Sequence, residues 1–258
     1  MNRQTDREWL QKLKDACADV TVTDLTSLTP PAGNVARQAS VLLLFTDAPG
    51  AHPEAPADIP LTEPEVVSAP TALPYILLLE RAHSMRSHAG QIAFPGGVQD
   101  STDQGAVAAA LREAQEETGL DPRSVEVVGV LPALWLPASN FDVTPVVGFW
   151  RTPGAVHAVD PAETASVHLV ALDALLDSDN RVTIRHFSGY LGPAFLIDGL
   201  IIWGFTAGLL SRLSAKCGWE RPWDESRIIA LPDEMIASSR RDHRRAGTAA
   251  ALSVEATH

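Results

Sequence analysis

Cysteine is almost absent from this chain of 258 residues. The two that occur, Cys17 and Cys217, lie far apart in the sequence and belong to neither a CxxC pair nor the Cys/His spacing of a zinc site. This pattern excludes a disulfide framework and favours reduced, structural thiols in a cytoplasmic protein. We do not expect either thiol to act as a nucleophile.

Positive charge is also scarce, since 20 Lys and Arg residues face 32 Asp and Glu residues. The formal net charge is −12 and the pI is about 5.0. Binding along nucleic acid requires a basic surface, so nucleic acid is not an expected partner. A small anionic substrate stays open, because a bound metal ion and a few arginines can reverse the local field.

A long uninterrupted apolar segment is the third absence. The most apolar stretch, residues 193–213, contains Asp198 and several glycines, and it falls short of the ~18 consecutive apolar residues of a membrane span. We predict a strand followed by a buried helix there. The first twenty residues are too charged for a signal peptide and predict an amphipathic helix carrying Trp9, Leu10 and Leu13. No membrane partner is expected.

The most informative stretch is residues 94–120, FPGGVQDSTDQGAVAAALREAQEETGL. Its Ala-rich part predicts a helix that ends at Gly119, with Glu113, Glu116 and Glu117 on one face at i, i+3 and i+4. A separate stripe is expected to face the core, so the acids should point away from it. The stripe consists of Val107, Leu111, Ala114 and Thr118.

Three carboxylates on one face repel each other unless a positive charge lies among them. A hard divalent cation, Mg²⁺ or Mn²⁺, prefers such oxygen ligands and keeps positions open for water and phosphate oxygens. The alternative is a solvated helix face on which Arg112 offsets Glu116.

The context of these acids resembles the Nudix box, G-x5-E-x7-R-E-U-x-E-E-x-G-U, where U is a bulky apolar residue. Its second half is matched by Arg112, Glu113, Glu116, Glu117, Gly119 and Leu120. The first half departs from the pattern: counting from Gly97, an Asp at position 103 replaces Glu, and eight residues rather than seven separate it from Arg112. Ala114 occupies a U position, but its side chain is smaller than the bulky apolar residue of the pattern. Because of these departures, the resemblance assigns no role to Asp103.

The preceding segment narrows the resemblance. Residues 77–97, LLLERAHSMRSHAGQIAFPGG, are similar to the coenzyme A pyrophosphatase branch, which pairs LLxxR(S/A)xxxRxxxGxxxFPGG with a box one residue longer than usual. The stretches VTPVVG and IIWGFTA are similar to further elements of that branch. The resemblance implies a Nudix-type α/β/α sandwich with a mixed β-sheet, where composition and periodicity alone predict only α/β or α+β.

The resemblance also implies roles for individual residues. Glu113, Glu116 and Glu117, with the backbone carbonyl of Gly97, would bind the metal ion, and Arg112 would orient a neighbouring glutamate. The alternative for Gly97 is a plain turn.

Further predicted site residues lie outside the helix. Arg81 and Arg86 would bind phosphate groups, and Gly96 would permit close approach of the substrate. Glu163 would be an additional ligand or the general base. The alternatives are ordinary surface arginines, a plain turn and a solvated loop acid.

Three segments are predicted along the chain. Residues 1–34 form an N-terminal helix and a linker that ends in SLTPPAG, residues 35–237 form the Nudix domain, and residues 238–258 form a flexible tail. Inside the domain, the Pro-rich insert 47–74 predicts an irregular loop or partial disorder. Strands are expected at residues 37–45, 75–80, 90–97, 125–131 and 141–150.

The resulting hypothesis is a Mg²⁺- or Mn²⁺-dependent hydrolase that cuts coenzyme A or acyl-CoA into 3′,5′-ADP and (acyl-)4′-phosphopantetheine. One alternative is another nucleoside diphosphate derivative, such as ADP-ribose or NADH. A second is a protein that binds nucleotides without hydrolysing them. The expected partner is a small CoA-like nucleotide, and a homodimer is one open option for assembly.

Overall fold

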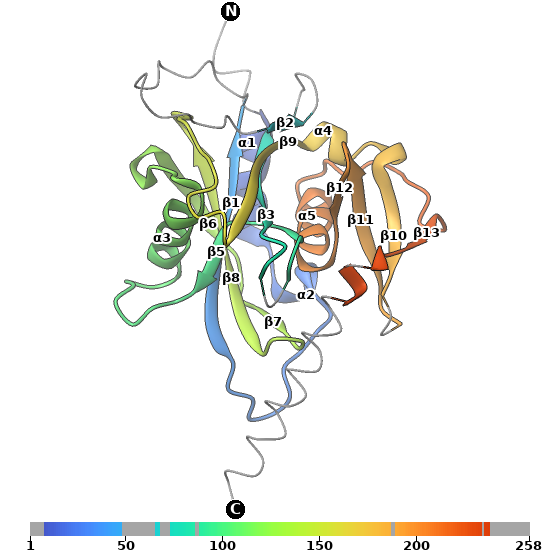
Figure 1. Cartoon of the computed structure of the whole chain (residues 1–258), viewed down its shortest axis with the longest axis horizontal. Coiled ribbons are helices and arrows are strands. Elements are labelled where there is room, and N and C mark those ends of the chain that lie inside the picture. Colours follow the sequence, from blue (N-terminus) through green and yellow to red (C-terminus); the bar gives the residue numbers. More distant parts are fainter. Residues whose placement is uncertain are drawn as a thin grey trace, which may run out of the picture.

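The computed structural model describes residues 8–47, 65–67, 73–85, 88–186, 189–233 and 235–237 (Figure 1). Arg86, most of the Pro-rich insert and the tail 238–258 therefore lie outside the described residues, as do the predictions made for them. Within the described part, no helix has both the length and the apolar character needed to cross a membrane.

The larger of two sheets has nine strands and is mixed. Its main path runs β2-β9-β3-β1-β8-β6, while β4 pairs with β3, β5 with β1 and β7 with β8. The β1·β8 and β2·β9 pairs are parallel, and the other pairs are antiparallel. The strands are β1 (Arg37–Thr46), β2 (Glu65–Val67), β3 (Tyr75–Arg81), β4 (Ile92–Ala93), β5 (Gly96–Val98), β6 (Val125–Val130), β7 (Leu134–Leu136), β8 (Phe141–Trp150) and β9 (Thr164–Ala171).

Both faces of this sheet carry helices, which gives three layers. Alternate residues of β1 point to opposite sides, so Leu42 and Leu44 pack in one core cluster and Leu43 and Phe45 in another. The helix α3 (Ala106–Thr118) covers the first side. The helices α1 (Glu8–Asp19) and α5 (Gly204–Lys216) cover the second side, as Figure 1 shows. The predicted mixed α/β class is confirmed.

The smaller sheet has four strands in the order β12-β11-β10-β13. Asp198 and Gly199 have φ angles of 47° and 83°, so they form a tight turn between β11 (Leu191–Ile197) and β12 (Leu200–Ile202). The predicted strand and buried helix in residues 193–213 are thus a hairpin followed by α5. The other elements are α2 (Val22–Leu25), η1 (Pro122–Ser124), α4 (Leu172–Leu175), η2 (Ser178–Asn180), β10 (Arg181–Arg185) and β13 (Ile228–Ala230).

Two predicted elements differ from the structure. Residues 90–97 form two short strands, because β4 pairs with β3 and β5 with β1, and Pro95 between them has no N–H for a ladder. The prediction of an irregular loop is wrong for Glu65–Val67, which form β2 on the outer side of β9. Three residues are too few to show strand periodicity, so only the pairing partner reveals this strand.

Candidate active site

The helix α3 begins after the acidic loop and ends at Gly119, whose φ of 69° is left-handed and whose N–H donates to the carbonyl of Gln115. Ala110, Ala114 and Thr118 are buried against the sheet. Small side chains allow the helix axis to approach β1 closely, which accounts for alanine at the position where the Nudix pattern has a bulky residue. The predicted apolar stripe is confirmed, with Val107 and Leu111 at its half-buried margin.

The three glutamates of α3 differ sharply in exposure. The side chain of Glu116 is 59% exposed, that of Glu113 is 19% exposed and that of Glu117 is 10% exposed. Glu117 is thus mostly buried although it lies outside the apolar stripe of the helix. Its carboxyl is turned toward strand β5, where the N–H of Gly96 donates to Oε2 at 2.9 Å.

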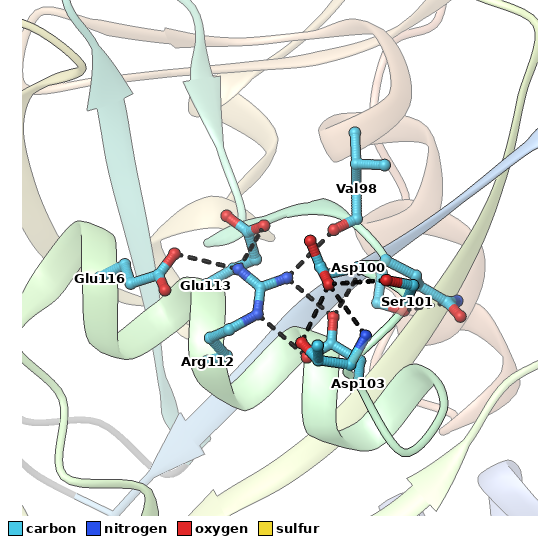
Figure 2. Close-up of polar contacts among 10 residues, drawn as sticks. Val98, Asp100, Ser101, Asp103, Arg112, Glu113 and Glu116 are labelled. Carbon is cyan, nitrogen blue, oxygen red and sulfur yellow. Dashed lines mark hydrogen bonds and ion pairs between the residues drawn. The ribbon is translucent and has the colours of Figure 1, made fainter.

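Arg112 links two of these glutamates to the loop before the helix, as Figure 2 shows. Its Nε and Nη2 donate to the two carboxylate oxygens of Asp103 at 3.0 and 2.8 Å. Its Nη1 donates to Glu113 at 2.9 Å and to Glu116 at 3.0 Å, and Nη2 also donates to the carbonyl of Val98 at 3.1 Å. The planar guanidinium thus fixes both glutamates through bonds to charged groups.

Asp103 therefore takes the place of the acid in the first half of the Nudix pattern. Its side chain is 6% exposed, and the hydrogen bonds from Arg112 hold its pKa below the ordinary value. The longer spacing is taken up by a turn, in which the N–H of Asp100 donates to Asp103 and the N–H of Thr102 donates to Asp100. The sequence shows an acid, Asp103, at the sixth position after Gly97, where the pattern has Glu. It does not show that Asp103 pairs with Arg112.

The double glycine at positions 96 and 97 lets the backbone touch both the helix and the sheet. A Cβ on Gly97 would lie 2.5 Å from the carboxyl carbon of Glu113, and a Cβ on Gly96 would lie 2.3 Å from the carbonyl oxygen of Ser40. Any larger residue would displace one of these groups. The glycines are thus required for the close approach of β5 to the acids of α3.

Burial dominates the electrostatics of Glu117 and raises its pKa to about 7. The Gly96 N–H and the charge of Arg81 lower the pKa, whereas the charges of Glu113 and Glu163 raise it. Arg81 Nη1 lies 3.9 Å from Glu117 Oε1. The structure therefore brings three other predicted site residues, Arg81, Glu113 and Glu163, within electrostatic reach of Glu117.

Glu163 reaches this site from the loop before β9. Its carbonyl accepts a hydrogen bond from the N–H of Ala82 at 2.9 Å, which ties the loop to the residue after Arg81. The side chain is exposed. Arg86, the other predicted phosphate ligand, is not among the described residues, so its place in the site stays a prediction.

The donor set fits a hard divalent cation. Two poorly solvated carboxyls, Glu113 and Glu117, both have a raised pKa caused first by burial, so a cation beside them would favour their ionised forms. Within the described ranges, no three His, Cys, Asp or Glu side chains converge as a ready-made metal cage. The missing ligands are then available from backbone carbonyl, water and substrate oxygens, which magnesium-like ions commonly keep.

A family model described as "NUDIX domain" matches residues 67–188. An uncharacterized Nudix hydrolase, NudL of Cronobacter sakazakii, is 39% identical over 151 residues, covering 58% of this chain and 78% of the relative. The chain belongs to the Nudix hydrolase family. NudL of Salmonella paratyphi B gives 40% identity over 157 residues, covering 56% and 76% of the two chains.

Among solved structures, this Nudix hydrolase is similar to a Nudix hydrolase from M. smegmatis, RenU. The identity is 20%, the similarity covers 70% of this chain and 84% of the other, and the TM-score is 0.45. Nudix hydrolases act on nucleoside diphosphate derivatives and in general use divalent cations, which agrees with the oxygen-rich site between α3 and β5.

Proposed function

We propose that this Nudix hydrolase cuts the diphosphate bond of coenzyme A or acyl-CoA, giving 3′,5′-ADP and 4′-phosphopantetheine or its acyl form. One observation carries the proposal. The segment that resembles the coenzyme A pyrophosphatase branch, residues 77–97, begins on β3 and ends on β5, and it reaches the box helix at Glu117. Arg81 and Gly96 each contact the carboxyl of Glu117.

The protein groups have distinct tasks in this proposal. Arg81 offers a fixed positive charge for a phosphate oxygen, and its Nε is buried without a hydrogen-bond partner among the described groups. Glu113 and Glu117, with Glu116 and the Gly97 carbonyl as further candidates, would hold Mg²⁺ or Mn²⁺. When bound, the cation would screen the diphosphate charge and favour ionisation of the attacking water.

A carboxylate must accept the proton of the attacking water, and Glu163 is our candidate. It reaches the site from a separate loop, its side chain is exposed, and Arg112 does not hold it. A base needs to stay within hydrogen-bond reach of that water, and the backbone bond from Ala82 fixes the loop at this point.

The test is a substrate profile of the purified protein with Mn²⁺ and with Mg²⁺. Coenzyme A, acetyl-CoA, ADP-ribose and NADH would be compared, with products identified by mass spectrometry. We expect kcat/KM for the two coenzyme A substrates to exceed the other values at least about tenfold, the scale of one good discriminating contact. Higher values for ADP-ribose or NADH would overturn the assignment.

A second candidate, nucleotide binding without hydrolysis, is favoured by one observation: no ready-made cage of three metal-binding side chains converges in the described part of the chain. The intact Arg112 and Asp103 pairing counts against it, because it restores the part of the box that differs from the family pattern. Calorimetry that shows coenzyme A binding, with no product in any divalent metal, would favour this candidate.

We also propose that the Nudix domain extends over residues 35–237, beyond the matched range. Strand β1 precedes that range, yet it pairs with β3, β5 and β8 in the middle of the larger sheet. A domain that began at residue 67 would lack this central strand. Limited proteolysis should therefore leave a stable fragment that retains Arg37–Thr46.

A further inference from the structure

The antiparallel ladder between β3 and β9 changes register beside the site. Regular pairing runs from Tyr75 opposite Ala171 to Glu80 opposite Ser166, and the next pair is Arg81 opposite Thr164. Ala165 is therefore the extra residue of a β-bulge. Bulges of this kind bend a strand and change the direction of the side chains that follow.

The last regular pair before the bulge is joined by side chains. Ser166 Oγ donates to Glu80 Oε2 at 3.0 Å, and Ser166 Oγ lies 2.7 Å from His168 Nε2. Because the hydroxyl has one proton and gives it to Glu80, the proton of the second contact belongs to His168. The other carboxylate oxygen of Glu80 contacts His83 Nε2 at 3.0 Å.

The cluster of Glu80, Ser166 and His168 lies on one face of the sheet, and the glutamates of α3 lie on the other. Leu78, opposite His168, packs in the core beneath α1 and α5, so Glu80 and Ser166 share that face by strand alternation. Arg81 points to the α3 side, where Nη1 is 3.9 Å from Glu117.

The residues immediately beyond the bulge are those of the active site. Arg81 follows Glu80 in β3, and Glu163 precedes Thr164 in β9. The Ala82 N–H to Glu163 carbonyl bond, at 2.9 Å, closes the far side of the bulge. The bulge therefore lies between a side-chain link on one side and two predicted substrate or catalytic groups on the other.

We propose that Glu80 and Ser166 are positioning residues, which hold the bulge so that Arg81 and Glu163 both face Glu117. They act through the backbone, since their own side chains lie on the face away from Glu117. The catalytic part of this inference rests on the proposed function, whereas its geometric part does not.

The geometric part is tested by amide hydrogen exchange of the full chain, without substrate. In Ser166→Ala, the Ala82 amide should exchange roughly tenfold faster, the effect of losing about one hydrogen bond of local stability. Ser166→Thr keeps the hydroxyl and should restore protection. Thr183→Val is the control, since it removes a comparable bond, from Thr183 Oγ1 to the Glu225 carbonyl, in the smaller sheet. Unchanged Ala82 exchange in Ser166→Ala would overturn the proposal.

The catalytic part is tested by a mutant cycle on diphosphate hydrolysis. Ser166→Ala should lower kcat/KM roughly tenfold to a hundredfold, because small displacements of reacting groups cost that much. In a background that carries both Arg81→Ala and Glu163→Gln, the further loss should fall below about twofold, since Ser166 acts through these two residues. An equal loss in both backgrounds would overturn the positioning role.

The two readouts separate the two proposals. A wild-type protein that hydrolyses none of the substrates would refute the proposed function, and the Ala82 exchange rates would still decide whether Ser166 holds the bulge. Glu80→Gln is a second variant of the same link, and it should raise Ala82 exchange in the same direction as Ser166→Ala.

Discussion

Two arginines show how differently this Nudix hydrolase uses the same side chain in its two sheets. Arg112, beside the larger sheet, is 29% exposed and is bonded to three carboxylates. Arg181, in the smaller sheet, is fully buried, with Glu220 and Ser211 as hydrogen-bond partners. Its guanidinium carbon lies 4.4 Å from the ring centroid of Trp223.

The electrostatic consequences run in opposite directions. The hydrogen bonds and charges of Asp103 and Glu113 raise the pKa of Arg112, whereas burial lowers the pKa of Arg181. Arg112 offsets part of the negative charge that Asp103, Glu113 and Glu116 bring together. Arg181 holds strand β10 to the chain around Glu220 and Trp223. Arg112 thus contacts the carboxylates of the candidate site, whereas Arg181 contributes to the packing of the smaller sheet.

The largest expected effect is on the turnover number, and it comes from Glu117 in the helix that also carries Arg112. Glu117→Gln should lower kcat by about a hundredfold or more, the loss seen when one preorganised transition-state group is removed. The fold should remain, because the amide fills the same volume. Glu220→Gln, which changes the carboxylate partner of Arg181, is the matched control and should keep full activity. A fully active Glu117→Gln would refute the metal assignment.

The second effect is a pH dependence of stability in the metal-free protein. The pKa of Glu117 in the folded state, about 7, is above the ordinary glutamate value of 4.5, so the folded state binds the proton more tightly than the unfolded state. Protonation of Glu117 therefore stabilises the folded state fully at pH values below the pKa of the unfolded state. This stabilisation, about 3 kcal/mol in the free energy of unfolding, is lost as the pH rises through 7.

Urea unfolding after chelation, at pH values from 4.5 to 8, measures this loss. Glu117→Gln should make the profile shallower, with a remaining slope from Glu113, whose pKa burial also raises. Glu116→Gln, at a 59% exposed position, is the control. Added Mn²⁺ should restore stability at the high-pH end, since a cation favours the ionised carboxyl. A profile in Glu117→Gln identical to that of the wild type would contradict the assignment of the slope to this residue.

The third effect is a loss of stability when Arg181 is replaced. Arg181→Met removes the hydrogen bonds to Glu220 and Ser211 but retains apolar volume next to Phe195 and Trp223. We expect a loss of about 2 kcal/mol in the free energy of unfolding, typical of a disrupted buried polar cluster, with kcat/KM unchanged. Chemical denaturation and the diphosphate assay test this pair of outcomes. A large loss of kcat/KM with unchanged stability would reverse the division of roles between the arginines.

The smallest effect is expected at the partner of Arg112. Asp103→Asn should lower kcat/KM roughly tenfold, because outer groups that orient ligands have effects of about this size. The matched control is Asp121→Asn, which weakens the exposed pair of Asp121 and Arg123 near the end of the same helix. Equal activities of the two variants would mean that Asp103 does not orient the glutamates.

Most elements that lie within one segment followed from local patterns. The strands 141–150 and 75–80, the amphipathic N-terminal helix and the helix before Gly119 all occur as predicted, with shifts of at most a few residues. The failures are elements that depend on distant partners. Strand β2 is visible only beside β9, and the segment 90–97 divides because its halves pair with different strands.

The sequence by itself determined that Glu113, Glu116 and Glu117 share a helix face next to a double glycine, because helix geometry fixes neighbours three and four residues apart. Only the tertiary structure decided which of the three is buried and which partner Asp103 takes. It also decided that Glu163, just before the bulge in β9, lies close enough for its charge to raise the pKa of Glu117. These outcomes depend on sheet order and on the register between strands remote in the chain, which no local spacing specifies.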